Sequence, residues 1–206
     1  SRNQPPLIRQ VIGSRLQQMT EILESVNATW LLPVLVVLLG VWLVYRRRAG
    51  GDHLHRVLKD IAFARIEGLV VPDSDDGEIQ IDYLVLTSQG LLILHIKDVQ
   101  GVVFGSDKMQ DWTVISKDRR YTFSNPQPAL YDRIAAVRQI VRQVPVEGRV
   151  LFLDGAEFTK GVPSMVSTLD ELHEQFGEKD KAAAQRKVEA FKPHWELLQK
   201  QALRGA

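Results

Sequence analysis

The chain has 206 residues, a formal net charge of +1 at pH 7 and no cysteine. This length accommodates one ordinary domain together with additional segments. The near-neutral charge excludes a strong nonspecific attraction to nucleic acid, although it is compatible with a local basic patch. Without cysteine, the chain forms no disulfide, no thiolate metal site and no cysteine nucleophile.

The first 27 residues are amphipathic. Apolar residues recur at three- and four-residue spacing from Ile8 to Val26, and this period predicts a helix. Two interpretations of the helix remain open. It is either a solvated lead-in to the next segment, or a surface that associates with a membrane or with a second copy of the chain.

Residues 28–48 have the features of a membrane-spanning helix. Residues 28–45 contain no charge, and their number lies at the lower edge of what spans a bilayer. Trp30 and Tyr45 stand near the two ends, as in interfacial aromatic belts, and three arginines at 46–48 place the following chain in the cytoplasm. We predict a single-pass protein of the cell membrane; the alternative is a buried helix of a soluble protein.

Beyond the arginines, the pattern alternates between helical and extended periods. The short segment Ala49-Gly50-Gly51 predicts a hinge before a helix at 53–64. The acidic turn at 72–78 lacks the ligand spacing of a calcium loop. Pro193 should break or kink the charged C-terminal helix. The remaining expected elements are strands at 66–71, 102–104, 112–115, 149–153 and 164–167, and helices that follow Pro126 and Thr168.

The central stretch, residues 79–101, reads as a β-hairpin. Two apolar runs flank a turn at 87–90 that ends in glycine. If the first and last turn residues pair, Asp82 lies opposite His95, within one residue, and shares a face with Lys97. Ionisable groups at the end of a core-facing hairpin are costly to desolvate unless they are paired or used in chemistry.

This layout resembles that of the PD-(D/E)xK nucleases. The sequence around it resembles one branch of that superfamily, the nuclease-related (NERD) domain. In that superfamily an acidic residue early in one strand is followed, on the next strand, by an acidic-x-lysine triplet. The resemblance covers residues 51–176 and implies an α/β fold, a restriction-endonuclease-like mixed sheet flanked by helices, here preceded by one transmembrane helix. The pieces that carry it are IDYLVLTSQGLLILHIKDVQG, the tryptophan of DWTV, the helix entry SNPQPALYDRIAAVRQIV, and RVLFLDGAEF.

The resemblance also implies DNA hydrolysis with a divalent metal, Mg2+ or Mn2+. Carboxylates would hold the ion, and a lysine would stabilise the charge that develops on the phosphate. Asp82 and Lys97 match these roles, but His95 stands in the place of the family's acid. A neutral imidazole brings no negative charge to a hard cation, so His95 either binds a softer metal or forms an ion pair with Asp82. Asp52 matches a family acid that joins the metal site, and it is equally suited to cap a helix.

We therefore predict a nuclease-related protein with an impaired active site. The catalytic candidates are Asp82, His95 and Lys97, and the metal-ligand candidates are Asp82, His95 and Asp52. The alternative is a catalytically inactive, membrane-tethered module that binds nucleic acid or a protein. A third interpretation is a structural partner that acts through its terminal helices. The expected divisions are an amphipathic segment at 1–27, the transmembrane helix at 28–48, a NERD-like domain at 50–176 and a charged helical segment at 177–206.

Overall fold

The computed structural model describes residues 28–72 and 77–204. The amphipathic helix expected over residues 1–27 lies outside the described residues. The chain divides between residues 49 and 50 into two compact units.

The described part of the first unit belongs to helix α2, which runs from Ala28 to Ile61. Every residue from 33 to 42 is exposed. None of the helices in the described ranges combines the length and the apolar character that crossing a membrane requires. The prediction of a transmembrane helix at 28–48 is therefore not supported. The side chains of residues 28–32 and 43–48 lie outside the described set.

The hinge predicted at residues 49–51 is wrong, because α2 continues through these residues. Glycine weakens a helix interior by about 1 kcal/mol relative to alanine but does not prevent the helical conformation. Asp52 therefore lies inside α2 and does not cap it. Past this point one stripe of the helix is buried in the second unit, and it consists of Leu54, Val57, Leu58 and Ile61.

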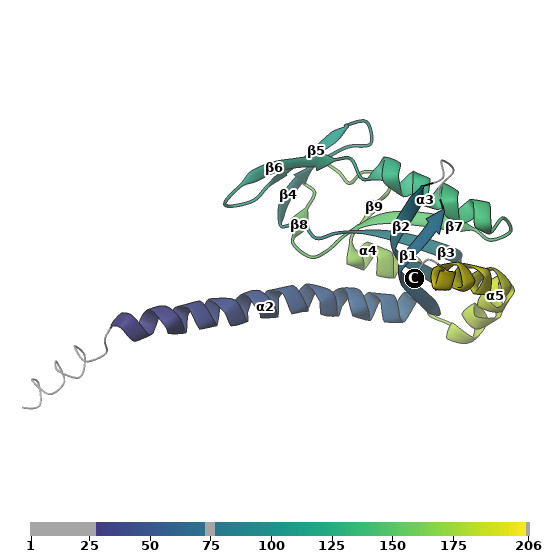
Figure 1. Ribbon diagram of the computed structural model, residues 1–206, viewed down its shortest axis with the longest axis horizontal. Helices are drawn as coiled ribbons and strands as arrows, with labels where there is room; N and C mark the ends of the chain where they lie inside the picture. Colours follow the sequence, from purple (N-terminus) through teal and green to yellow (C-terminus); the bar gives the residue numbers. More distant parts are fainter. Residues whose placement is uncertain (1–27, 73–76, 205–206) are drawn as a thin grey trace, which may run out of the picture. The chain divides into compact units, whose positions relative to one another are not determined.

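The second unit is organised on a five-stranded mixed sheet, sheet A, with the strand order β1-β2-β3-β7-β9 (Figure 1). β1 (Ala64–Pro72), β2 (Glu78–Thr87) and β3 (Gly90–Lys97) pair antiparallel. β7 (Val146–Phe152) runs parallel to β3, and the short β9 (Val166–Ser167) runs parallel to β7. The parallel pair requires a crossover, which the chain between β3 and β7 provides.

A second, four-stranded mixed sheet, sheet B, has the order β6-β5-β4-β8. It contains β4 (Gly101–Phe104), β5 (Asp111–Ile115), β6 (Arg120–Ser124) and β8 (Ala156–Glu157). The sequence did not lead us to expect β6 or β8. β6 alternates exposed and half-buried residues. Because a polar residue stands between its two aromatic residues, the segment has no continuous apolar run that would predict a strand.

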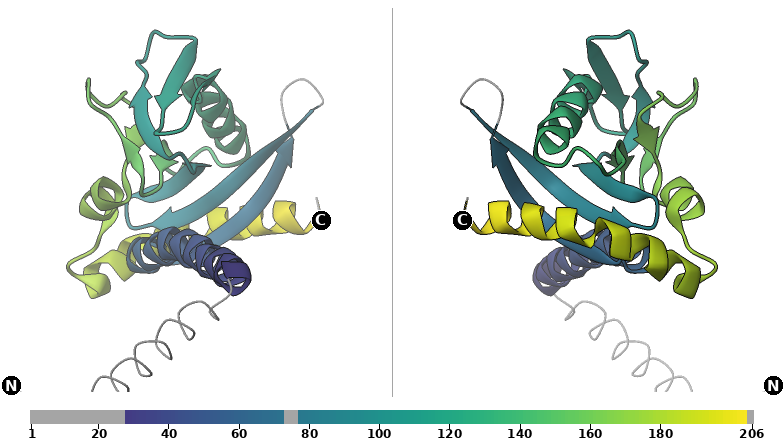
Figure 2. Two further views of the ribbon diagram at one scale, coloured as in Figure 1. Left: turned by 90° about the vertical axis from the view of Figure 1, so that its left-hand side faces the viewer. Right: turned by 90° about the vertical axis from the view of Figure 1, so that its right-hand side faces the viewer.

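Helices cover both faces of sheet A. Helix α3 (Gln127–Ile140) and sheet B lie on one face, as Figure 2 shows. A Cβ on Gly148 of β7 would come within 2.8 Å of the Leu130 side chain of α3, so this glycine permits the close approach of the helix. The opposite face packs against α4 (Leu169–Phe176) and the end of α2. The predicted mixed α/β class is thereby confirmed.

The start of helix α4 follows from local chemistry. Thr168 caps α4 through a capping box with Glu171, as its sequence position predicted.

Helix α5 (Lys181–Arg204) runs unbroken through Pro193, so the predicted break is wrong. Trp195 and Leu198, which follow the proline, are both buried against the sheet, and this packing holds the helix together across the missing hydrogen bond.

The register of the central hairpin agrees with the prediction and contains no bulge. Thr87 pairs with Gly90, and the pairing continues back to Tyr83 opposite Leu94. Gly90 has a φ of +129°, and a Cβ there would lie 2.4 Å from the Pro145 carbonyl oxygen. A side chain is therefore excluded at this turn position by both backbone conformation and space.

We expect Ile93→Asp to unfold the second unit, because Ile93 is fully buried at the centre of sheet A. An unpaired carboxylate there should cost at least about 4 kcal/mol. Thermal unfolding of the full chain, followed by circular dichroism, should lose its cooperative transition. Ile115→Asp is the control, because Ile115 is 42% exposed. A transition that Ile93→Asp leaves unchanged would contradict the hairpin assignment.

Candidate functional site

Asp82 and His95 meet at the open end of the β2–β3 hairpin. His95 Nδ1 lies 2.9 Å from Asp82 Oδ2. The backbone N–H of Ile96 donates to the same carboxylate oxygen at 2.8 Å. Because a carboxylate only accepts hydrogen bonds, Nδ1 of His95 carries the hydrogen in this contact. The sequence-predicted pair is thus brought together by a hydrogen bond from the imidazole to the carboxylate.

The surroundings of Asp82 favour its charged form. Burial raises the pKa of the Asp82 carboxyl, but the hydrogen bonds from His95 and the Ile96 amide oppose this, as do the charges of His95 and Arg133. The net result is a pKa below the ordinary value of 3.8. Arg133 comes from α3 and donates to the Gln80 carbonyl oxygen at 2.8 Å, which places it over β2.

Lys97, the third candidate, lies at the end of β3 with a different partner. Its Nζ sits over the ring of Phe123, 5.6 Å from the ring centroid. Phe123 belongs to β6, so sheet B supplies this contact. Lys97 lies on the same face of β3 as His95, because the two are separated by one residue of a regular strand. Asp98 is exposed immediately past the strand.

Asp52 is not joined to Asp82 by any contact among the described residues. It is exposed on α2, whose buried stripe packs with Val85 and Leu92 on the face of sheet A opposite to Asp82. Its neighbour His53 instead contacts Asp154 at 2.8 Å and Asp170 at 3.6 Å. In the part of the chain that the structure describes, no three His, Asp or Glu side chains form a group that could hold a metal ion.

Two residues beside the site escaped the sequence analysis. Arg133 lies within the helix expected after Pro126, and its approach to Asp82 depends on how α3 crosses β2. Phe123 belongs to RYTFS, in which aromatic and polar residues alternate. That alternation is a strand signal, and it would have placed an inward aromatic ring after the Trp112 strand.

The hairpin, the crossover helix α3 and the parallel strand β7 belong to a mixed α/β domain, which carries Asp82 and Lys97 on two neighbouring strands. A sequence model of the nuclease-related domain, NERD, matches residues 46–153. This match covers more than half of the chain, and the chain therefore belongs to the NERD family.

One relative is an uncharacterized protein of Bacillus anthracis, which is 24% identical over 102 residues. The aligned region is 48% of each of the two chains, so this chain spans about half the length of that relative. No solved structure matches the chain.

We expect Asp82→Asn to destabilise the protein in a pH-dependent way. A lowered folded-state pKa means that the carboxylate contributes its full stability above the unfolded-state pKa, and loses it as the pH falls through the folded-state pKa. The substitution should cost about 1 kcal/mol at pH 7, a value reduced because the carboxylate is partly exposed.

The difference between Asp82→Asn and the unmodified chain should shrink below about pH 4. Urea unfolding at a series of pH values measures it. Asp98→Asn, at an exposed position, is the control and should leave the free energy of unfolding nearly unchanged. A cost for Asp82→Asn that stays constant down to pH 2 would contradict a charged Asp82 in the hydrogen bonds.

Proposed function

We propose that this chain is a nuclease-related protein that hydrolyses DNA weakly, because a histidine occupies the place of an acidic metal ligand. The observation that carries the proposal is the contact of His95 Nδ1 with Asp82 Oδ2 at 2.9 Å. Asp82 and Lys97 keep the positions of the motif on a restriction-endonuclease-like sheet. His95, the first residue of the triplet, directs a hydrogen-bond donor at the Asp82 carboxylate, whereas the motif has an oxygen ligand at this position.

Nuclease-related domains commonly use divalent metals, and Mg2+ prefers six oxygen ligands in octahedral geometry. At the hairpin end, Asp82 is the only one of the three candidates with a carboxylate. Its Oδ2 already accepts hydrogen bonds from His95 and from the Ile96 amide. The residues present therefore do not fit Mg2+ or Mn2+, and the native chain should cleave DNA slowly with either ion.

We expect His95→Glu to raise metal-dependent DNA cleavage. The substitution replaces a hydrogen-bond donor by an anionic oxygen ligand beside Asp82, and the gain should be at least about tenfold, as is typical for restoring an interaction at a metal. Plasmid nicking by the full chain with Mg2+ and then with Mn2+ measures it. Asp82→Ala and Lys97→Ala should each abolish the gained activity.

Other outcomes of this experiment have definite meanings. If the unmodified chain cuts with Mn2+ or Zn2+ and His95→Glu lowers that activity, His95 is itself a ligand for a softer ion. Strong Mg2+-dependent cleavage by the unmodified chain would refute the impaired site, and another carboxylate, such as that of Asp98, would then have to complete it. His95→Gln is a matched control, because it removes the imidazole without adding a charge.

The second candidate function is a catalytically inactive module that binds nucleic acid or a protein. An open groove of about 620 Å3 beside the end of α3 favours it. Its rim includes Tyr131, Arg138 and Arg142, and its lining contains no acidic residue. A gel-shift titration of the unmodified chain with DNA in the presence of a chelator separates the two functions. Tight binding without cleavage, even in His95→Glu, would favour the module.

We also propose that the protein is anchored in the cell membrane by a single pass, with residues 50–206 in the cytoplasm. The support is the uncharged run 28–45, the arginines at 46–48 and the exposure of every residue from 33 to 42. A protein partner that binds the terminal helices would fit such an anchored arrangement.

We expect the full chain to remain with the membranes after alkaline carbonate extraction. Leu38→Arg should weaken this retention, because an arginine at the centre of a membrane helix costs about 2.5–3.5 kcal/mol. Leu197→Arg, on the exposed side of α5, is the control. Release of the unmodified chain by carbonate, or an active C-terminal periplasmic reporter, would contradict the proposed anchoring.

A further inference from the structure

The surroundings of Lys97 differ from those of Asp82. No ion pair among the described residues includes Lys97. Its ammonium instead lies over the Phe123 ring at 5.6 Å. An aromatic face attracts a cation through its quadrupole and carries no net negative charge. Phe123 therefore restrains the Lys97 side chain without neutralising it, so that the full positive charge stays available to an anion.

The Phe123 ring is itself held in place by a cluster of aromatic residues. Trp112 meets it edge to face, with ring centroids 6.1 Å apart, and Trp112 also stacks on Phe152 at 6.3 Å. Phe152 is the strand neighbour of Lys97 across the β3–β7 pair. The Trp112 ring N–H donates to the Ser106 carbonyl oxygen at 3.1 Å, which fixes the orientation of the indole.

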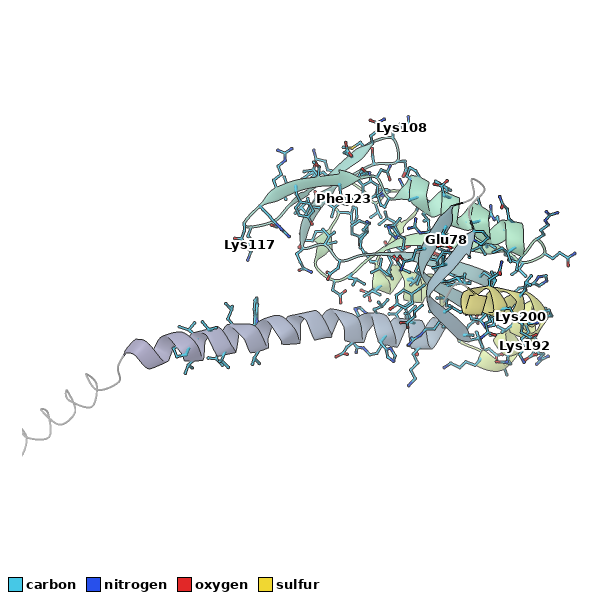
Figure 3. All side chains as sticks on the ribbon, viewed as in Figure 1. Glu78, Lys108, Lys117, Phe123, Lys192 and Lys200 are labelled. Atoms are coloured by element: carbon cyan, nitrogen blue, oxygen red, sulfur yellow. The ribbon has the colours of Figure 1, made fainter. Side chains whose placement is uncertain are left out.

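Sheet B therefore supports the residue at the end of β3 from outside the hairpin. Figure 3 shows Phe123 among the strands of sheet B, away from Lys108 and Lys117 at the loops of this sheet. Without the ring, the Lys97 side chain has four rotatable bonds and no ion-pair partner among the described residues to fix its direction. Reactions that need a charge at a defined point lose rate when that charge is mobile.

We propose that Phe123 is a positioning residue for Lys97, and that it holds the ammonium on the Asp82 and His95 face of sheet A, where it meets the phosphate of a nucleic acid. The role of the phosphate rests on the proposed function, whereas the restraint of the side chain does not. Phe123 makes no contact with the reacting atoms and acts only through Lys97.

The experiment has one readout that is independent of activity. In the full chain, the ε-methylene protons of Lys97 should be shifted upfield by the Phe123 ring, and the relaxation of the ε-carbon should report a restrained side chain. Phe123→Leu should remove the shift and increase the mobility of this carbon, whereas Phe123→Tyr should retain both. Phe158→Leu is the matched control, because Phe158 packs on Phe152 at 5.0 Å within the same aromatic cluster.

The second readout uses the His95→Glu background. Phe123→Leu should lower kcat about fivefold with little change in KM, and Phe123→Tyr should restore it. Phe158→Leu should leave kcat unchanged. Phe123→Met serves if the leucine variant fails to melt cooperatively, because it fills the space without a ring. A loss of kcat in Phe123→Leu alone indicates a positioned charge, whereas similar losses in Phe123→Leu, Phe123→Tyr and Phe158→Leu indicate a general loss of packing.

Failure of the proposed function and failure of the positioning role of Phe123 give different experimental results. If His95→Glu gains no cleavage, the proposed function fails, and the Lys97 resonances still decide the inference. If the Lys97 shift and relaxation are the same in Phe123→Leu and in the unmodified chain, the inference is overturned. Equal losses of kcat in Phe123→Leu, Phe123→Tyr and Phe158→Leu would also overturn it, because they would indicate a packing effect.

Discussion

The pairing register of β2 against β3 is the constraint on which the rest of the structure depends. A shift by one residue would turn every side chain of a strand to the other face of the sheet. Gly90 fixes the register, because its backbone conformation and its approach to Pro145 exclude a side chain. With this register, four leucine and isoleucine side chains enter the core near the turn, and Asp82 and His95 face each other at the open end.

At that open end, the protein supplies the positive charge that the Asp82 carboxylate requires. His95 and the Ile96 amide donate to one oxygen, and the charge of Arg133 on α3 acts on the same group. A cation that took Oδ2 as its ligand would have to displace these donors. The hydrogen bonds that keep Asp82 ionised are therefore the same bonds that compete with a metal for it.

The parts of the site that are local in sequence were predictable, and the parts that depend on crossings between elements were not. The Asp82–His95 pairing follows from a four-residue turn and strand alternation. The expected hinge and the cap at Asp52 were wrong because a glycine pair was taken to end the helix, whereas α2 continues through it and buries the apolar stripe that follows. The contacts of Arg133 and Phe123 join elements separated by tens of residues, and no periodicity within either element specifies them.

The two charged residues of the site depend on separate supports. Asp82 is held by donors from its own hairpin, and Lys97 is held by an aromatic ring from sheet B. A change at residue 95 alters the anionic half of the site and should leave the contact between Lys97 and Phe123 in place. For this reason one substitution is a meaningful test of whether His95 alone separates this chain from an active nuclease.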